Sequence, residues 1–350
     1  MKTKKLSVGI AAYNMERYLN RCVDSLLIPS IDELEVIIVN NASTDDTARI
    51  THEYAEKYPD SIKVVDIEEN HHYGGAVNAA LANATGTYFK LCDADDKFCR
   101  ESLEDFLRFL ESAQSDIVFS PYRTRESNSG AVIREVNPAE RYLNRTLDIE
   151  DVEWTSPEML PYQVMHSICV KTSILKSNEY RQTEGISYSD SEFVFYSVLF
   201  SKTCSFFALP VYEYYTGRDG QTCSTDSMIK SHMHFYINAK RMLDTYVSLP
   251  LETGNETQSF LFGVILRCIK SFIGSSLIYI RNNAEQIELY NGLVAESRES
   301  LLPCPIENRL LSEDRWFRLW KRFHIPHMVF YYLGKTKQSC SNFRARIIKN

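Results

Sequence analysis

Three carboxylates, Asp93, Asp95 and Asp96, stand within four positions directly after the segment 88–92. That segment is rich in strand-forming residues, so the cluster is expected at the end of a β-strand. Carboxylates this close repel one another unless a cation lies among them. Two interpretations follow: a divalent-metal site, or an acidic turn that caps the helix expected over 98–111. The flanking segments must decide between them.

Strand-like and helix-like segments alternate on both sides of this cluster. The expected strands cover 6–12, 35–39, 62–67, 88–92 and 116–120, and the expected helices cover 15–27, 43–58, 74–84 and 98–111. This alternation predicts an α/β fold with a mostly parallel sheet, helices on both faces, and ligands outside the carboxyl ends of the strands. The residues that directly follow the strands should meet at one edge; they are Tyr13, Asn40, Asn41, Glu69, Asn70 and Asp93.

The pattern loosens after residue 121 and then becomes helical. Polar turns fill 122–163, with a hairpin tip expected at 128–130. Further expected elements are a strand at 162–170, a helix at 190–201, a strand pair at 204–215, a polar loop at 217–221, and helices at 227–247, 257–281 and 284–300. We therefore expect an α/β domain over 1–225, a helical domain over 226–314 and a tail over 315–350. Packing or self-association into a homo-oligomer is the simplest role for the helical domain.

The tail combines positive charge with aromatic residues. Residues 315–350 contain nine Lys or Arg, no Asp or Glu, and eight aromatics. Basic residues interleaved with aromatics are typical of segments that contact a membrane surface. A solvated basic terminus is the alternative. We favour peripheral membrane contact through this tail.

Composition narrows the class of protein. The 350 residues carry a net charge of -7, which argues against general nucleic-acid binding. Nine cysteines occur without a CxxC pair, so free thiols in a reducing cytosol are expected rather than disulfides or zinc ligands. No apolar signal segment precedes the first expected strand, and the most apolar stretch, 260–280, is interrupted by Arg267 and Lys270. The expectation is a cytoplasmic protein without a membrane span.

The first strand ends are polar but lack the usual phosphate-binding glycines. Neither GxGxxG nor GxxxxGK[ST] occurs in the sequence, which argues against a Rossmann dinucleotide site and a P-loop. An aromatic, Tyr13, and an amide, Asn41, follow the first two strands instead. Tyr13 is suited to stack on a base and Asn41 to pair with a base edge, although a core position and a turn position are the structural alternatives. Together they favour a base pocket.

A small-residue helix start, Gly74-Gly75-Ala76, lies between the base pocket and the acidic cluster. Such a start lets a ligand or a neighbouring strand approach the backbone, and its free N–H groups favour an anion. Close packing of helix on sheet is the structural alternative. We select Gly75 and Asn78 as candidate binding residues.

Taken together, the motifs resemble those of the family 2 glycosyltransferases, which have the GT-A fold. The resemblance covers about residues 6–224 and rests on four segments in order. They are SVGIAAYNMERYLNRCVDSLL, EVIIVNNASTDDT, NHHYGGAVNAALANATGTYFKLCDADD, and YSDSEFVFYSVLFSKTCSFF followed by YEYYTGRDGQT. The acidic cluster corresponds to the family's DXD motif. The metal interpretation is therefore favoured over the cap, with Asp96 as the residue expected to cap the helix.

The resemblance assigns roles to individual residues. It implies that Ala12, Tyr13 and Asn41 hold the nucleoside of a nucleotide sugar. Asp93 would face the ribose and the metal, and Asp95 would bind the Mn²⁺ or Mg²⁺ that bridges the diphosphate.

Three further residues complete the implied site. Asp190 stands where the family places its general base, which takes the proton of the acceptor hydroxyl in an inverting reaction. As the first residue of an expected helix it is alternatively an N-cap. Arg218 and Gln221 lie in a loop that would close over the diphosphate, where Arg suits phosphate oxygens. A surface arginine is the alternative there.

The sequence departs from the family pattern at three places. Asn40 and Asn41 stand where the second motif commonly has an Asp, Val77 replaces a common Arg, and Ser189 replaces the Glu beside the base. An amide can still pair with uracil, so a UDP-sugar remains the favoured donor.

We therefore expect an inverting, metal-dependent glycosyltransferase, a hexosyl- or N-acetylhexosaminyl-transferase, that builds cell-surface polysaccharide from the cytoplasmic face. The acceptor would be a glycan or a lipid-linked sugar, with Trp154, His166 and Glu184 as candidate contacts. One alternative is a nucleotidyltransferase on a similar sheet, which needs a basic glycine-rich loop that residues 11–17 lack. The other is an inactive glycan-binding scaffold.

Overall fold

The structure is a computed structural model that describes residues 4–218, 221, 225–250, 254–280, 284–299 and 317. The chain divides into two compact units, Met1–Gln221 with Asn255–Leu261, and Thr222–Gly254 with Phe262–Asn350. The first unit contains all of the strands described below and the candidate site. The second unit contains helices.

The first unit begins with alternating strands and helices. They are β1 (Leu6–Ala12), α1 (Leu19–Asp24), the 3-10 helix η1 (Ile31–Glu33), β2 (Leu34–Asn41), α2 (Thr47–Lys57), β3 (Ile62–Ile67), α3 (His72–Asn83), β4 (Tyr88–Asp93), β5 (Lys97–Phe98), α4 (Arg100–Ser112) and β6 (Ile117–Phe119). The expected strands and helices of this half are confirmed, with shorter bounds for the first helix.

The rest of the unit is less regular, as its turn-rich sequence indicated. It contains β7 (Tyr122–Glu126), β8 (Val132–Glu135), η2 (Glu140–Tyr142), β9 (Thr146–Asp148), η3 (Ile149–Asp151), η4 (Leu160–Tyr162), η5 (Met165–Ser167), β10 (Ile168–Lys171), α5 (Thr172–Ser177), α6 (Asp190–Phe200), β11 (Thr203–Phe206) and β12 (Tyr212–Thr216). Strands β7 and β8 form the expected hairpin, with Gly130 in the left-handed region at φ 69°.

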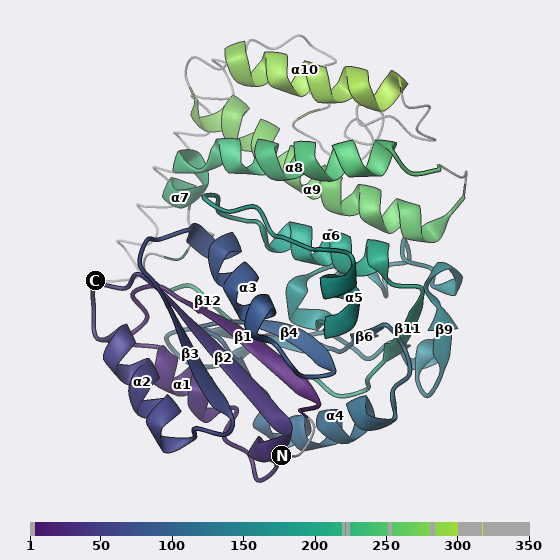
Figure 1. Ribbon diagram of the computed structural model, residues 1–350. Helices are drawn as coiled ribbons and strands as arrows, with labels where there is room; N and C mark the ends of the chain where they lie inside the picture. The colour runs from purple at the N-terminus through teal and green to yellow at the C-terminus, as the bar shows by residue number, and fades with distance from the viewer. Residues whose placement is uncertain are drawn as a thin grey trace. The chain divides into compact units, whose positions relative to one another are not determined.

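The central sheet has eight strands in the order β3-β2-β1-β4-β10-β6-β11-β9 (Figure 1). Strands β3, β2, β1 and β4 are parallel to one another, whereas β10 is antiparallel to both of its neighbours and β9 is antiparallel to β11. Strands β6 and β11 are also parallel to each other. The sheet is therefore mixed, and the candidate residues Ala12, Asn41 and Asp93 lie in its larger parallel part.

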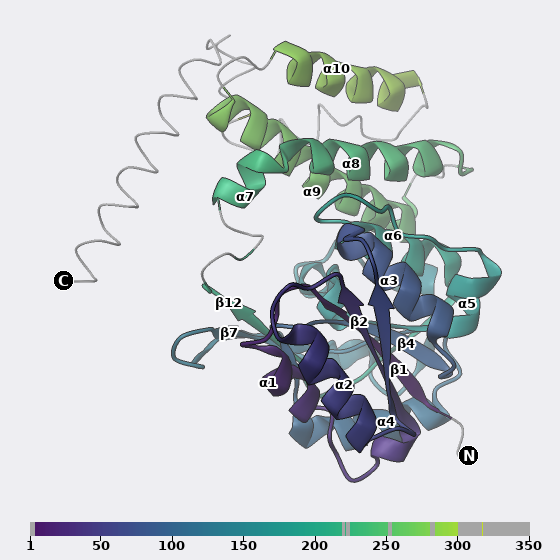
Figure 2. The same cartoon turned by 60° about the vertical axis from the view of Figure 1, so that its left-hand side comes forward.

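Chain direction decides which face each helix covers. From β1 the chain adds β2 and then β3 toward one edge of the sheet. It then returns past β2 and β1, so that β4 lies on the other side of β1. Because such crossovers are almost always right-handed, this reversal places α3 on the opposite face from α1 and α2. Helix α3 packs against β1 and β2, and α2 packs against β2 and β3; Figure 2 shows α3 and α2 from the side.

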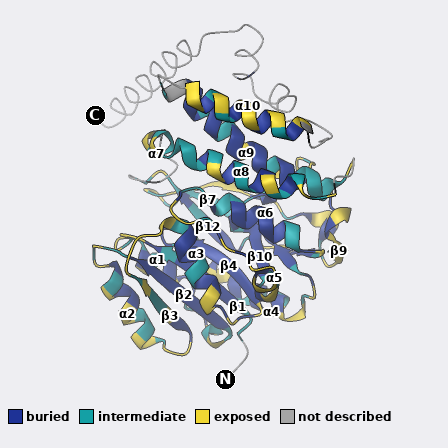
Figure 3. Ribbon diagram, turned by 45° about the horizontal axis from the view of Figure 1, so that its top comes forward, coloured by how far each residue is buried: buried dark blue, intermediate teal, exposed yellow. Residues whose placement is uncertain are grey.

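The core of the unit lies around β1, β2 and β4. All eight residues of β2 are buried, as are six of the seven residues of β1, and these strands are dark blue in Figure 3. Gly9 of β1 is required by this packing, since a Cβ there would lie 2.9 Å from the Cβ of Ala80 on α3. A dry, close-packed layer under the strand ends keeps the backbone of the site fixed.

A buried carboxylate, that of Glu35, links neighbouring strands through hydrogen bonds at the end of the sheet away from the site. It accepts hydrogen bonds from the Ser7 hydroxyl, the Lys63 ammonium, and both the backbone N–H and hydroxyl of Thr85. The Ser7 hydroxyl also accepts the backbone N–H of Gly86 at 2.8 Å. Strands β1, β2 and β3 and the turn that starts β4 therefore meet at one side chain.

A second sheet has the order β5-β12-β7-β8. Strand β12 pairs with β5, which directly follows the acidic cluster, and with β7 in parallel. The strand thus runs beside the cluster and delivers residues 217 and 218 next to it.

The second unit contains α7 (Thr225–Lys230), α8 (His232–Val247), most of α9 (Glu256–Tyr279) and α10 (Ala284–Glu299). Aromatic contacts join α8 to α9: the ring of Tyr236 is tilted against that of Phe272 and the ring of Tyr246 stacks on that of Phe262, with centroids 5.4 and 5.7 Å apart. Among the described helices, α9 alone is long and apolar enough to cross a membrane, and 72% of its apolar stretch is buried, as in a core helix. The tail predicted to contact a membrane lies outside the described residues, except Phe317.

Replacement of Glu35 by Gln is expected to lower the free energy of unfolding by about 2 kcal/mol at pH 7. Burial acts to raise the pKa of Glu35, but the hydrogen bonds it accepts outweigh burial and lower the pKa to about 2. A depressed carboxyl pKa gives stability that is present above the unfolded value and is lost as the pH falls toward 2. Urea unfolding of wild type and Glu35→Gln should show that the difference between their unfolding free energies becomes smaller from pH 4.5 downward. A difference that does not change with pH would contradict this role of Glu35.

Candidate active site

Strand β4 ends in the acidic cluster that the sequence indicated. Carboxylate oxygens of Asp93, Asp95 and Asp96 lie within 4.8 Å of one another. The backbone N–H of Asp96 donates to the carbonyl of Asp93 at 3.0 Å, which closes a tight turn and brings the side chains together. Asp95 and Asp96 are buried, and Asp93 is half-buried. The cluster therefore holds three acidic groups in a poorly solvated turn.

Asp96 fastens this turn to β12 and does not cap a helix. Its carboxylate accepts the hydroxyl of Tyr212 and the backbone N–H of Tyr215, each at 2.7 Å. Helix α4 has Cys99 at its N-cap position and no side-chain capping bond. The prediction of Asp96 as a cap was wrong because β12, distant in sequence, supplies donors to it. Asp93 and Asp95 remain the carboxylates available to a metal ion.

Electrostatics at Asp93 are unfavourable without a cation. Burial, followed by the charges of Asp95 and Asp190, raises the pKa of Asp93 to about 8, although a hydrogen bond from Tyr73 and the charge of Arg218 act against this. A divalent cation between Asp93 and Asp95 would remove this penalty, and carboxylate oxygens are the ligands that Mg²⁺ and Mn²⁺ prefer. The donor set therefore fits such an ion.

Asp190 lies close to the cluster although the sequence separates them widely. It is the first residue of α6, and its charge contributes to raising the pKa values of both Asp93 and Tyr73. Ser189 is the N-cap of α6, so the alternative of Asp190 as the cap was wrong. The structure brings together the predicted metal ligands and the predicted base.

Two arginines surround the cluster. Arg218 forms an ion pair with the Asp95 carboxylate, and the Arg21 guanidinium donates to the Asp95 carbonyl. The Arg21 guanidinium also lies 3.7 Å from the ring centroid of Tyr215, an arrangement typical of a cation–π contact. Arg218 thus lies at the acidic turn, where the diphosphate-binding role was predicted. Arg21 was missed because a lone Arg on a helix gives no signal in the sequence.

The predicted nucleoside residues lie at the ends of β1 and β2. Ala12 is buried at the end of β1, and Tyr13 follows it with 45% of its surface exposed, so its ring is accessible for stacking. Asn41 is buried and donates to the side-chain oxygen of Asn70 at 3.1 Å and to the carbonyl of His72 at 2.9 Å. Both amide hydrogens of Asn41 therefore hold the turn before α3. Its contact with a base stays a prediction.

Gly75 and Asn78 occupy the contact between α3 and the loop before α6. A Cβ at Gly74 would lie 2.0 Å from the carbonyl oxygen of Thr183, and a Cβ at Gly75 would lie 2.3 Å from the Cβ of His71. Asn78 exchanges two hydrogen bonds with the backbone of Gln182, at 2.8 and 2.9 Å. Close packing, the structural alternative, accounts for these residues, and a role in binding stays a prediction.

Gln221 closes the segment that follows β12. Its side chain donates to the carbonyl of Tyr215 at 2.8 Å and accepts the N–H of Gly217 at 3.0 Å. These bonds shape the backbone around Arg218. The predicted diphosphate contact of Gln221 itself is untested.

The candidate acceptor contacts fall in different environments. Trp154 is fully buried, with its ring 5.0 Å from Phe119 and 4.9 Å from Phe260, so this prediction was wrong. His166 stacks between Tyr212 and Tyr214 at 4.8 and 4.5 Å. Glu184 accepts a hydrogen bond from Asn78 at 2.9 Å and belongs to the contact between the loop and α3.

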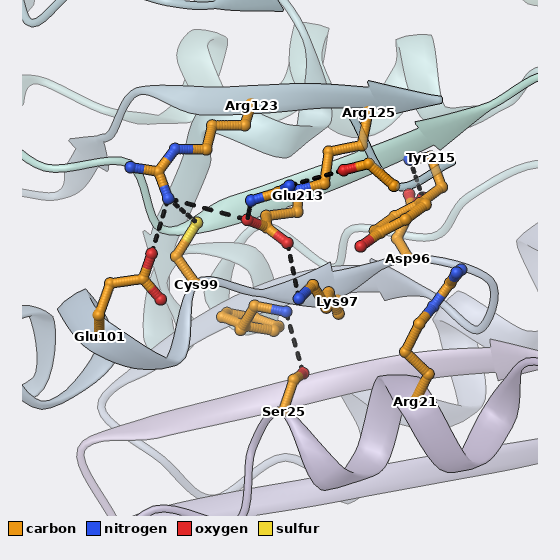
Figure 4. A network of polar contacts seen from close by, with 12 residues as sticks. Arg21, Ser25, Asp96, Lys97, Cys99, Glu101, Arg123, Arg125, Glu213 and Tyr215 are labelled. Atoms are coloured by element: carbon orange, nitrogen blue, oxygen red, sulfur yellow. Dashed lines mark hydrogen bonds and ion pairs between the residues drawn. The ribbon is translucent and has the colours of Figure 1, made fainter. Parts of the chain in front are cut away.

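A network of salt bridges around the buried carboxylate of Glu213 supports β12 beside the cluster (Figure 4). Glu213 pairs with Arg125 at 2.6 Å and with Lys97 at 2.9 Å. Arg123 lies between Glu213 at 3.8 Å and Glu101 at 2.7 Å, with Cys99 on its third side. Although the Cys99, Glu101 and Glu213 atoms are close enough to hold a metal ion, a guanidinium already occupies their centre.

Comparison with known proteins agrees with this geometry. Residues 7–161 match the family model for glycosyl transferase family 2. The chain is 38% identical over 107 residues to the putative glycosyltransferase EpsE of Bacillus subtilis, covering 31% of this chain and 38% of EpsE. It is 27% identical over 227 residues to the poly(ribitol-phosphate) beta-N-acetylglucosaminyltransferase TarS of Staphylococcus aureus, covering 63% of this chain and 37% of TarS. Over residues 7–161, the chain therefore matches the family 2 glycosyltransferases.

Solved structures show the same fold. The crystal structure of S. aureus TarS 1–349 has a TM-score of 0.63 at 19% identity and covers 96% of this chain and 91% of that one. The same TarS segment in complex with UDP-GlcNAc gives a TM-score of 0.61 at 20% identity, covering 96% of this chain and 92% of that one. The mannosyltransferase PcManGT of Pyrobaculum calidifontis, in complex with GDP-Man and Mn²⁺, gives a TM-score of 0.52 at 15% identity. This match covers 95% of this chain and 87% of that one. These likenesses establish the GT-A fold.

Lys90, a residue that the sequence analysis did not select, lies fully buried in β4 below the cluster. Its ammonium donates to the carbonyls of His166 and Ile168 at 2.7 and 3.0 Å, which fixes η5 against β4. Burial lowers the pKa of Lys90 to about 8. Burial followed by the Lys90 charge lowers the pKa of His166 to about 3, so this imidazole stays neutral.

Stability should therefore depend on pH through Lys90. Between about pH 8 and 10.5 the unfolded chain holds a proton on Lys90 that the folded protein has released, so the contribution of this residue to stability rises with pH, by at most about 1.4 kcal/mol per unit. Urea unfolding should show that the free-energy difference between wild type and Lys90→Met changes in this direction over that range. The exposed Lys202→Met is the control, and its difference from wild type in unfolding free energy should not change with pH. If the difference for Lys90→Met also does not change with pH, the lowered pKa of Lys90 is refuted.

Proposed function

We propose that this protein transfers a sugar from a nucleotide sugar, with a UDP-sugar favoured, to a glycan or lipid-linked acceptor in the synthesis of cell-surface polysaccharide. The observation that carries the proposal is the clustering of Asp93 with Asp95, near enough to Asp190 for its charge to act on Asp93, and with Arg218 paired to Asp95. The curated relatives include EpsE and TarS, and the chain spans only 38% and 37% of their lengths.

Asp93 and Asp95 would hold a Mn²⁺ or Mg²⁺ ion, and Arg218 would contact the diphosphate. The ion would supply positive charge that offsets the charge developing on the departing nucleoside diphosphate. Arg218 would exchange its bond with Asp95 for bidentate pairing with phosphate oxygens, which the guanidinium geometry suits. PcManGT, a protein of the same fold, was solved with Mn²⁺, which supports this choice of ion.

Asp190 would act as the general base. It takes the proton of the acceptor hydroxyl while that oxygen forms a bond to the anomeric carbon, and the bond from this carbon to the diphosphate oxygen breaks. Attack opposite the leaving group inverts the anomeric centre. The location of Asp190 at the start of α6, beside the metal ligands but on a separate element, supports a role on the acceptor side.

A UDP-sugar is favoured over other donors for two reasons. The exposed ring of Tyr13 is available for stacking on a base. TarS structures with UDP-GlcNAc and with UDP share the fold over most of this chain. A hexose or N-acetylhexosamine is the proposed sugar. We further propose that the protein acts at the cytoplasmic face of the membrane, with contact through the basic tail.

Replacement of Asp190 by Asn should lower the transfer rate by about 10²- to 10⁴-fold, since the general base is lost. Binding of the nucleotide sugar should persist, because Asp190 lies on the acceptor side. The rate is measured by release of nucleoside diphosphate with and without acceptor, and donor binding by calorimetry. The exposed Asp60→Asn is the matched control and should retain full activity. Unchanged transfer by Asp190→Asn would remove this residue from the mechanism.

A thermal-shift screen tests the metal and the base together. UDP at about 100 times its dissociation constant with Mn²⁺ should raise the melting temperature by about 5 °C, since binding adds about 2.7 kcal/mol. EDTA and Asp95→Ala should each remove the metal-dependent part of the shift. A metal-dependent shift with GDP and none with UDP would overturn the uridine assignment, whereas equal shifts with and without EDTA would overturn the metal.

A further inference from the structure

The backbone of the acidic turn is held by an arginine of α1. The Arg21 guanidinium donates through Nη2 to the carbonyl of Asp95. One helical turn further on, the hydroxyl of Ser25 accepts the backbone N–H of Phe98 at 3.0 Å. Residues four positions apart lie on the same face of a helix, so this end of α1 contacts both ends of the segment 95–98. The turn that carries the candidate metal ligands is therefore bonded to α1 through its main chain.

The guanidinium itself is held against an aromatic ring. Its Cζ atom lies 3.7 Å from the ring centroid of Tyr215, on β12, and 5.9 Å from that of Tyr18, at the start of α1. Figure 4 shows Arg21 extending from α1 toward Tyr215 and Asp96. Tyr215 is buried, and its backbone N–H donates to the Asp96 carboxylate at 2.7 Å. A guanidinium this close to the face of a fixed ring has little freedom to rotate, so the direction of its bond to Asp95 is set.

The charge of Arg21 has no acidic partner within the described part of the chain. None of the carboxylates there forms an ion pair with it, and its Nε atom is buried without a hydrogen-bond partner. A positive charge beside a cation site repels the cation. The charge of Arg21 would therefore weaken metal binding, whereas its bond to the Asp95 carbonyl would strengthen metal binding by orienting the turn. These two effects have opposite signs, so a measurement can separate them.

Arg21 and Arg218 contact different parts of Asp95. Arg218 pairs with the carboxylate, which is the group that a metal ion would bind. In the proposed reaction Arg218 moves to the diphosphate and leaves this carboxylate to the ion. Arg21 donates to the carbonyl, and this bond does not have to break when the ion arrives. The turn would thus keep its shape while its side chain changes partner.

We propose that Arg21 is a positioning residue whose guanidinium, stacked on Tyr215, holds the Asp95 turn in the shape that binds the metal ion. This role rests on the proposed function, because it lies within the same site. Groups that orient the ligands of a metal typically change its affinity by about 10- to 100-fold when they are removed. The ring of Tyr215 is part of the same arrangement, since without it the guanidinium loses its fixed direction.

Arg21→Met removes the charge and every donor but keeps an unbranched side chain. We expect its affinity for Mn²⁺, measured by the electron paramagnetic resonance signal of the free ion in the absence of nucleotide, to fall about 10-fold. Arg21→Lys keeps the charge but loses the planar guanidinium, and a similar fall is expected from it. At saturating Mn²⁺, kcat of both variants should return to within about twofold of the wild-type value, because the ligands themselves are unchanged.

The ring of Tyr215 provides a matched pair of variants. Tyr215→Leu removes the ring and should lower Mn²⁺ affinity as Arg21→Met does, whereas Tyr215→Phe keeps the ring and should retain wild-type affinity. Arg108→Met replaces an exposed arginine of α4 and should leave both Mn²⁺ affinity and kcat unchanged. If Arg21→Met does not fold, as judged by circular dichroism, Arg21→Lys and the two Tyr215 variants test the same role.

The outcomes distinguish this role from the function on which it rests. If Asp95→Ala abolishes Mn²⁺ binding while the Arg21 variants bind the ion as the wild type does, the positioning role is refuted and the metal site stands. Tighter Mn²⁺ binding by Arg21→Met would show that only its charge acts, and wild-type affinity in Arg21→Lys would show that the stacked guanidinium is not needed. Either result would also refute the proposal. If Asp95→Ala leaves Mn²⁺ binding unchanged, the proposed metal site itself fails.

Discussion

Repulsion among carboxylates buried at the end of β4 is the constraint on which the rest of the site depends. Asp93, Asp95 and Asp96 lie within 4.8 Å of one another in a turn that water reaches poorly. Two of them are given partners from distant elements: Asp96 accepts two donors from β12, and Asp95 pairs with Arg218. The second sheet and the segment after β12 supply these donors. A fold without them would not tolerate the cluster.

The parallel half of the fold follows from local pattern. Strands β1 to β4 are rich in apolar, strand-forming residues, and the alternation with helices predicts both their direction and the edge where Tyr13, Asn41 and Asp93 meet. The register confirms this, since Ala11 of β1 is paired with Asp93 of β4. The antiparallel insertion of β10 was not predictable, because pairing between residues distant in sequence leaves no periodic signal. Its four residues, Ile168–Lys171, would fit either direction.

The sequence indicates a site residue when its side-chain type and motif suggest its chemistry. It does not indicate a residue whose contribution depends on contacts with elements distant in sequence. Asp95 and Asp190 could be selected from the sequence because they stand in motifs that resemble those of the family 2 glycosyltransferases, and their roles stay predictions. Tyr212 could not be selected, since a tyrosine in a strand indicates a core. Trp154 and Asp96 show the opposite error: a large aromatic and a carboxylate beside a helix suggested surface roles, and contacts from distant strands place both in the interior.

The guanidinium of Arg123 between Glu101, Glu213 and Cys99 has a consequence for ion selectivity. Within the part of the chain that the structure describes, two groups of side chains have the spacing to enclose a cation. In the group formed by Cys99, Glu101 and Glu213, the guanidinium of Arg123 already contacts all three members. This covalently attached positive charge disfavours a divalent ion there, so the group competes little with the metal site proposed at the end of β4.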